Sequence, residues 1–100
     1  MHETILDTPE SRELDLGACE QILAPGNKSS VGEKYSAVFA LRNTGKDDAK
    51  LRLQAIQVLG QAMRDDSVLI AHESGYAIGQ MQDERACDLL IEVLNVILYM

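Results

Sequence analysis

The chain has 100 residues, of which 46% are hydrophobic and 4% aromatic, and its formal net charge is −7. This length suits one small domain, and a mostly aliphatic core without Trp favours packed helices over a β-sandwich. The negative charge disfavours nucleic-acid binding, because phosphates are contacted by clustered Lys and Arg, and it favours a basic protein or peptide partner. No apolar run approaches the roughly 20 residues of a membrane span and no signal-peptide pattern opens the chain, so we expect no membrane association and a cytoplasmic location.

The first predicted helix follows residues 1–7, which show no periodicity and are expected to be flexible, so the single domain is predicted over 8–100. Thr8 and Pro9 form a helix-start signature, a capping hydroxyl followed by proline. Pro25-Gly26-Asn27 is predicted to end this helix. Its buried face is expected to comprise Leu14, Ala18, Cys19, Ile22 and Leu23.

Two further helices are predicted in the middle of the chain. The second starts at a capping box, Ser30-Val31-Gly32-Glu33, and is predicted to end at Asn43-Thr44-Gly45. Asp47 or Asp48 can cap the third helix, which Arg64-Asp65-Asp66 closes. The side chains expected on its buried side are Leu51, Ala55, Ile56, Val58, Leu59 and Met63.

The fourth predicted helix occupies the apolar stretch Ser67–Asp83, with Asp66 as its N-cap. A fifth begins at Asp83-Glu84 and is expected to bury Leu89, Leu90, Val93, Leu94 and Ile97. No stretch shows the sustained alternation of a half-buried strand. We therefore predict an all-α fold of about five helices joined by short polar turns.

Cys19 and Cys87 are the only cysteines, and neither lies in a CxxC or a Cys/His metal spacing. We interpret them as small, buried, reduced residues of an intracellular protein. A disulfide between them is the alternative.

The second and fourth predicted helices resemble each other: aligning Ala40 with Ala77 gives an offset of 77 − 40 = 37 residues. Under this offset Phe39 aligns with Tyr76, and each copy reads as a helix, a polar turn with acidic residues and a second helix. A helix–turn–helix unit of nearly 40 residues indicates an α-solenoid of the HEAT or armadillo kind. Such repeats bury their faces against their neighbours.

His72 and Glu73 stand side by side in the middle of the fourth predicted helix. The first copy of the repeat has Tyr35 and Ser36 at these positions, so packing of the repeat does not require the pair. Imidazole and carboxylate are both iron ligands, whereas an unpaired charge inside a buried helix is costly. The alternative is that local hydrogen bonds satisfy the pair. The other dipeptide, His2-Glu3, lies in the flexible terminus and is not expected to bind metal.

The segments EKYSAVFALRNTG and LIAHESGYAIGQMQDERACDLLIEVL resemble deoxyhypusine hydroxylases, which are HEAT-repeat di-iron monooxygenases. The resemblance covers Thr8 to Val96, with H-E-x-x-Y-x-x-G-Q-M as its most specific motif. The family's iron ligands are His-Glu pairs on the inner surface of two similar halves, so the resemblance implies that His72 and Glu73 bind iron(II). It also implies a hypusine-containing translation initiation factor as the substrate, whose deoxyhypusine residue is hydroxylated to hypusine with dioxygen.

The family carries four His-Glu motifs, whereas this chain has one in the matching context and ends at Met100. One pair cannot complete a di-iron site, so we expect a truncated or divergent member, part of one half of such an enzyme, that holds iron incompletely or not at all by itself. The apolar C-terminal residues 95–100 are expected to pack on the other half or to self-associate. The alternative function is a non-catalytic HEAT-repeat module that binds a partner protein.

Tyr76, Gly79 and Gln80 follow the pair along the same helix and are the expected pocket residues. Successive helical residues turn by about 100°, so Gly79 and Gln80 lie nearly in line with His72-Glu73. Glycine in a helix costs about 1 kcal/mol relative to alanine, so Gly75 and Gly79 are expected either to allow close helix packing or to leave room beside a metal. For Tyr76, core packing of the ring is favoured over a hydroxyl that reaches the pocket. No catalytic residue is assigned apart from the metal ligands.

Overall fold

The computed structural model of the chain describes residues 15–88 and 91–92. They form four helices, α2 (Leu16–Ile22), α3 (Val31–Asp47), α4 (Ala49–Ala62) and α5 (Val68–Met81). Helical backbone recurs at 86–88 and 91–92, and this described part of the chain contains no strand. The prediction of an all-α fold is confirmed. No helix in the same part of the chain is long and apolar enough to cross a membrane.

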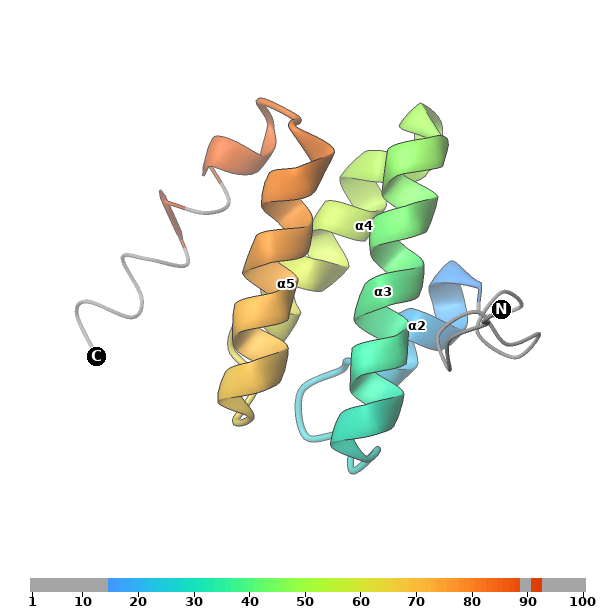
Figure 1. Ribbon diagram of the computed structural model, residues 1–100, viewed down its shortest axis with the longest axis vertical. Coiled ribbons are helices and arrows are strands. Elements are labelled where there is room, and N and C mark those ends of the chain that lie inside the picture. The colour runs from blue at the N-terminus through green and yellow to red at the C-terminus, as the bar shows by residue number, and fades with distance from the viewer. Residues whose placement is uncertain (1–14, 89–90, 93–100) are drawn as a thin grey trace, which may run out of the picture.

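The helices are arranged in two layers. α3 and α5 lie side by side and run in the same direction, and α4 lies behind them and packs against both (Figure 1). α2 packs against α3. Ile56 and Leu59 of α4, Leu41 of α3 and Ile78 of α5 are almost completely buried. The core therefore lies between the two layers. The opposite face of α3 and α5 is not covered by α4.

Helix boundaries reproduce the 37-residue repeat. Ser30 is the N-cap of α3 and Ser67 that of α5, and the two helices begin at the equivalent residues Val31 and Val68. Ala49 begins α4, and its equivalent Ala86 begins the helical backbone that follows α5. Matching caps place matching helices at matching positions, so the helical-repeat architecture predicted from periodicity is confirmed.

The first helix differs from its prediction. Asp15 has extended backbone and its carboxylate accepts a hydrogen bond from the Ala18 N–H at 2.7 Å, so it is the N-cap of α2. A single helix running from Thr8 through Asp15 is therefore wrong, because an N-cap residue lies outside the helix that it caps. Cys19 and Leu23 are buried as expected, whereas Thr8 and Leu14 lie outside the described residues.

The start of the second predicted helix is correct, but α3 ends two residues later than predicted. The capping box is present: Ser30 Oγ accepts from Glu33 N–H at 3.1 Å and Glu33 Oε1 accepts from Ser30 N–H at 2.9 Å. α3 then continues through Gly45 to Asp47. A Cβ on Gly45 would lie 2.6 Å from Met81 Sδ. The glycine therefore serves close packing of α3 on α5 and does not terminate the helix.

Of the two aspartates offered as the cap of the third helix, Asp48 fills the position and accepts from Lys50 N–H at 2.9 Å. Ala55, Ile56, Val58 and Leu59 are buried, as predicted. Met63 is half-buried, and Leu51 was predicted wrongly, since it is 37% exposed. Leu51 lies in the first turn of α4, where its side chain is not enclosed between the two layers of helices.

Asp66 was also predicted wrongly as the cap of α5. Ser67 Oγ accepts from Ile70 N–H at 3.4 Å and is the N-cap. The neighbouring Asp65 accepts from Ser67 N–H at 2.9 Å and from Lys34 Nζ at 2.8 Å. Burial by itself would raise the pKa of the Asp65 carboxyl, but the hydrogen bonds from Lys34 and Ser67 and the charge of Lys34 lower it overall from its ordinary 3.8.

The two cysteines are free thiols in different environments. Cys19 is buried, and burial, followed by the charge of Asp15, raises the pKa of its thiol to about 11. Cys87 is exposed, so the prediction of two buried cysteines is right for Cys19 and wrong for Cys87. The five side chains predicted to be buried by the fifth helix, Leu89, Leu90, Val93, Leu94 and Ile97, lie outside the described residues.

Candidate metal centre

His72 and Glu73 lie in the middle of α5. His72 is exposed and Glu73 is half-buried. The assumption that the pair lies inside a buried helix is wrong for part of α5: Val68 is 82% exposed and Tyr76 59% exposed. Water therefore solvates the imidazole, and the pair does not need a buried partner to be tolerated. The exposure of Tyr76 also excludes core packing as the role of its ring.

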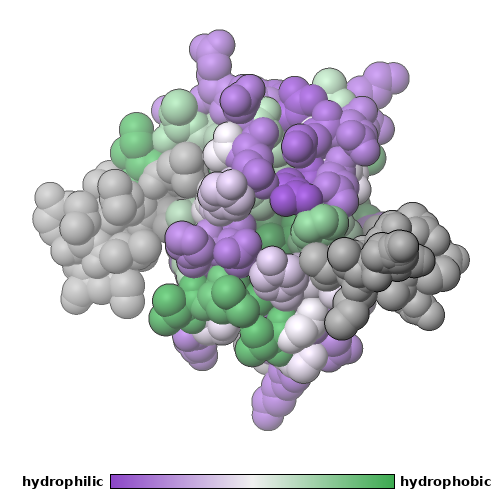
Figure 2. All heavy atoms as spheres, viewed as in Figure 1, coloured by the Kyte–Doolittle hydropathy of each residue, from purple (hydrophilic) through white to green (hydrophobic). Residues whose placement is uncertain are grey.

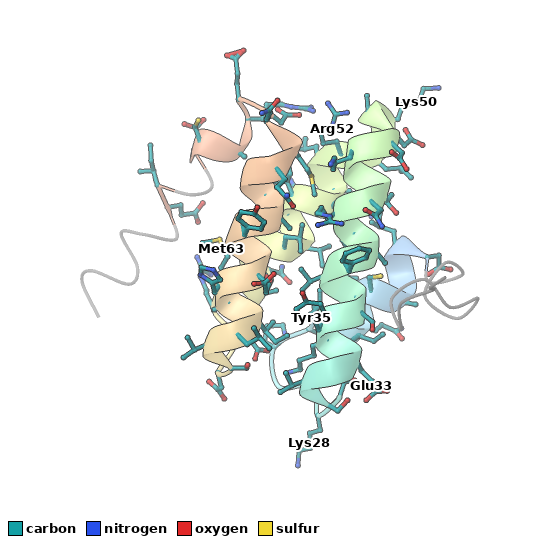
Figure 3. The ribbon with its side chains drawn as sticks, in the orientation of Figure 1. Lys28, Glu33, Tyr35, Lys50, Arg52 and Met63 are labelled. Atoms are coloured by element: carbon teal, nitrogen blue, oxygen red, sulfur yellow. The ribbon has the colours of Figure 1, made fainter. Side chains whose placement is uncertain are left out.

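Glu73 faces a crevice between α3 and α5, together with Tyr76 and Gln80. The crevice has a volume of about 30 Å³, which is room for a water molecule and little more. Tyr35 reaches into it from α3 (Figure 3). His72 and Gly79 do not line this crevice, and both are exposed. The five predicted site residues therefore form two groups: Glu73, Tyr76 and Gln80 in the crevice, and His72 and Gly79 beside it.

Arg42 of α3 also lines this crevice. Its guanidinium stacks over the Phe39 ring at 4.1 Å and donates to Gln80 Oε1 at 3.2 Å and to Asn43 Oδ1 at 3.3 Å. Its buried Nε finds no hydrogen-bond partner among the described residues. Sequence reasoning missed Arg42 and Tyr35 as parts of the site. The 37-residue offset could have found them, because it aligns Tyr35 with His72 and Arg42 with Gly79.

The two glycines of α5 differ. A Cβ on Gly75 would meet Met63 Cε at 3.4 Å, so close helix packing accounts for this glycine. A Cβ on Gly79 would meet nothing within 4 Å, and Gly79 is exposed. Packing within the described part of the chain does not explain Gly79.

Ser74, next to the pair, is completely buried, and its hydroxyl has no hydrogen-bond partner among the described residues. The equivalent residue of α3 is Ala37, which is equally buried. We expect Ser74→Ala to raise the free energy of unfolding by about 1 kcal/mol, because an unsatisfied buried hydroxyl costs about 1–3 kcal/mol. Urea unfolding measures this change. Ser36→Ala on α3 is the control for helix propensity alone, and a larger gain from Ser36→Ala than from Ser74→Ala would contradict the prediction.

His72 and Glu73 are the types of side chain that bind iron, but two donors are too few for a complete iron site. Imidazole nitrogen and carboxylate oxygen suit non-haem iron, whose common protein ligand set is two histidines and one carboxylate. Within residues 15–88 and 91–92, no three His, Cys, Asp or Glu side chains gather into a metal-binding group. Adjacent positions on a helix diverge by about 100°, so His72 and Glu73 point toward different neighbours. The pair by itself is half of a site.

Comparison with known proteins agrees with this architecture. The PBS lyase HEAT-like repeat family matches residues 70–95, which include the His-Glu pair. Together with the repeated helices, this match identifies the chain as a HEAT-like repeat protein. No solved structure matches the chain significantly.

The chain is also similar in sequence to members of one enzyme family. It is 42% identical over 63 residues to the deoxyhypusine hydroxylase of Drosophila melanogaster, covering 63% of this chain and 19% of that protein. The enzyme of Gallus gallus is 36% identical over 94% of this chain and 29% of its own length, and that of Homo sapiens 40% identical over 68% and 20%. The chain is a relative of the deoxyhypusine hydroxylases, and it spans less than a third of the length of those it matches.

Proposed function

We propose that the chain supplies part of the iron site of a deoxyhypusine hydroxylase, with His72 and Glu73 as metal ligands. The complete enzyme would hydroxylate the deoxyhypusine residue of a translation initiation factor to hypusine in the cytoplasm. Iron(II), when bound, would supply the activation of dioxygen. The observation that carries the proposal is a His-Glu pair, exposed at His72 and half-buried at Glu73, that occurs in one repeat only and lies within the segment shared with the hydroxylases.

The residues of this chain would hold and orient the metal. His72 would bind through a neutral ring nitrogen, and Glu73 through its carboxylate. α5 packs on both α3 and α4, so the helix that bears the ligands is held from two sides, and rigid support of this kind is what a metal site requires. Tyr76, Gly79 and Gln80 lie one to two turns further along α5 and would line the approach to the metal.

Anaerobic titration with Fe(II) tests the ligand assignment. We expect His72→Ala and Glu73→Gln each to weaken Fe(II) binding by at least tenfold relative to the unaltered chain, because each removes one of few protein donors. Glu84→Gln is the matched control: it makes the same change of charge at an exposed carboxylate outside the site, and it should leave binding unchanged. Helical circular dichroism verifies that every variant is folded. A folded chain whose Fe(II) affinity is unaltered by both His72→Ala and Glu73→Gln would contradict the ligand assignment.

A second candidate function is a HEAT-like module that binds a partner protein without chemistry. Its support is the absence of a third donor near the pair in the described part of the chain, together with the exposed apolar side chains of α5. The Fe(II) titration separates the two candidates. An iron-free, folded chain that binds a protein through the α5 face would favour the module.

A further inference from the structure

Glu73, Tyr76 and Gln80 form a row along α5. Their spacing of three and then four residues places them on one line of the helix, and all three line the crevice between α3 and α5. Hydrophobic side chains gather over the first turns of α5, and hydrophilic side chains cover the later turns of α3 and α5 (Figure 2). Gln80, in the last turn of α5, is therefore at the polar end of the row.

Arg42 fixes which way the Gln80 amide points. A guanidinium has hydrogen-bond donors and no acceptor, and Arg42 donates from Nη1 to Gln80 Oε1 at 3.2 Å. Oε1 therefore faces Arg42, and the NH₂ group lies on the other side of the amide. Among the described residues no acceptor takes a hydrogen bond from Gln80 Nε2, and this atom is accessible to solvent. The amide thus presents a fixed donor beside the crevice.

The Arg42 guanidinium is itself held in place. It stacks over the Phe39 ring at 4.1 Å and donates from Nη2 to Asn43 Oδ1 at 3.3 Å. Its Nε is buried without a partner among the described residues, and a buried donor without an acceptor is costly. An arginine on a surface helix can avoid this cost by turning into water. The cost is explained if the guanidinium serves to hold the Gln80 amide, since functional groups need such support from a second layer of side chains.

We propose that Gln80 donates a hydrogen bond from Nε2 to an oxygen acceptor of the substrate protein, and that Arg42 is the positioning residue that fixes the amide. This inference rests on the proposed function. The crevice, with a volume of about 30 Å³, does not admit a side chain, so the acceptor meets Nε2 at its mouth. Two oxygens qualify: a main-chain carbonyl beside the modified lysine, and the hydroxyl that the reaction adds.

Gln80→Glu separates a donor from a structural link. Glutamate has the same shape and still accepts from Arg42, so the contact between α3 and α5 remains, but the NH₂ donor is lost. We expect the metal-free chain to bind a hypusine-containing peptide, which carries both oxygens, about fivefold more weakly after this change, the effect of one neutral hydrogen bond. Isothermal titration calorimetry measures the affinity. The added negative charge attracts a basic peptide and cannot by itself cause the loss.

Asn43→Asp is the matched control. Asn43 is the residue of α3 that aligns with Gln80 (80 − 37 = 43), and it accepts from the same guanidinium but does not line the crevice. The change from amide to carboxylate is the same, and it should not weaken peptide binding. Helical circular dichroism verifies that each variant is folded.

Arg42→Met tests the positioning role. It should weaken binding of the hypusine-containing peptide by a similar factor, because the Gln80 amide is then free to turn. In a chain that already carries Gln80→Glu it should add no further loss, since both changes remove the same donor. An arginine that only stabilises the fold would add its own loss in both backgrounds, and that result would overturn its assignment.

A peptide with deoxyhypusine in place of hypusine identifies the acceptor. If Gln80→Glu weakens binding of both peptides, the acceptor is the main-chain carbonyl; if it weakens only the hypusine peptide, the acceptor is the hydroxyl. The inference is overturned if Gln80→Glu leaves both affinities undiminished, if Asn43→Asp lowers them equally, or if the unaltered chain binds neither peptide. None of these results bears on His72 and Glu73 as metal ligands, because the Fe(II) titration decides that assignment without a peptide. The two failures are therefore distinguishable.

Discussion

Replacing Leu59 by alanine is expected to lower the free energy of unfolding by about 3 kcal/mol, within the range of about 2–5 kcal/mol for buried Leu→Ala changes. Leu59 is completely buried in α4, and α4 packs against both α3 and α5. The substitution removes apolar contacts and leaves a cavity that these helices cannot close without losing their own packing. Urea unfolding followed by circular dichroism measures the effect.

Leu51→Ala is the matched control, because it makes the same change on the same helix at a residue that is 37% exposed. We expect a smaller loss of about 1 kcal/mol there, since more than a third of the Leu51 surface stays in contact with water and its truncation leaves no enclosed cavity. Equal losses at the two positions would show that the first turn of α4 is buried as deeply as its centre. That result would contradict the arrangement of the layers.

Replacing Asp65 by asparagine is expected to cost about 2 kcal/mol at neutral pH, because hydrogen bonds to charged groups contribute about 1.5–3 kcal/mol. The side chains of Lys34 and Asp65 are only 14% and 11% exposed, and their 2.8 Å ion pair joins α3 to the turn before α5. The change would leave the Lys34 ammonium without its carboxylate. It would also weaken the bond that Asp65 accepts from the Ser67 N–H.

The loss of unfolding free energy caused by Asp65→Asn should depend on pH. The pKa of Asp65 is lower in the folded chain than its unfolded value of about 3.9. Ionised Asp65 therefore contributes stability above about pH 4, and the contribution is lost as the pH falls through the folded-state pKa. The unfolding free energies of the unaltered chain and Asp65→Asn should differ constantly from pH 5 to 7 and converge below pH 4. Asp66→Asn, at the residue that sequence reasoning selected as the cap, should have almost no effect.

Much of the fold follows from local interactions, and sequence reasoning predicted it for that reason. The capping box at Ser30 and Glu33 joins residues three apart, so it can be recognised without knowledge of the rest of the chain. The 37-residue offset likewise follows from the sequence, and Val31 and Val68 begin their helices in register with it. Asp66 was chosen wrongly over Ser67 because several residues that can cap a helix stand together there. The contact of Lys34 with Asp65, 31 positions apart in the sequence, selects among them.

The chemistry of the candidate site follows from residue types alone: an imidazole and a carboxylate stand on one helix, in one repeat and not the other. The exposure and the neighbours of these groups depend on how the helices pack. A helix as apolar as α5 can be buried on every side or on one, and only the packing of α3 and α4 leaves Val68 and Tyr76 exposed and brings Tyr35 and Arg42 to the Glu73 crevice. The reason is physical: residue type sets what a side chain can bind, whereas exposure and neighbours depend on contacts between distant segments.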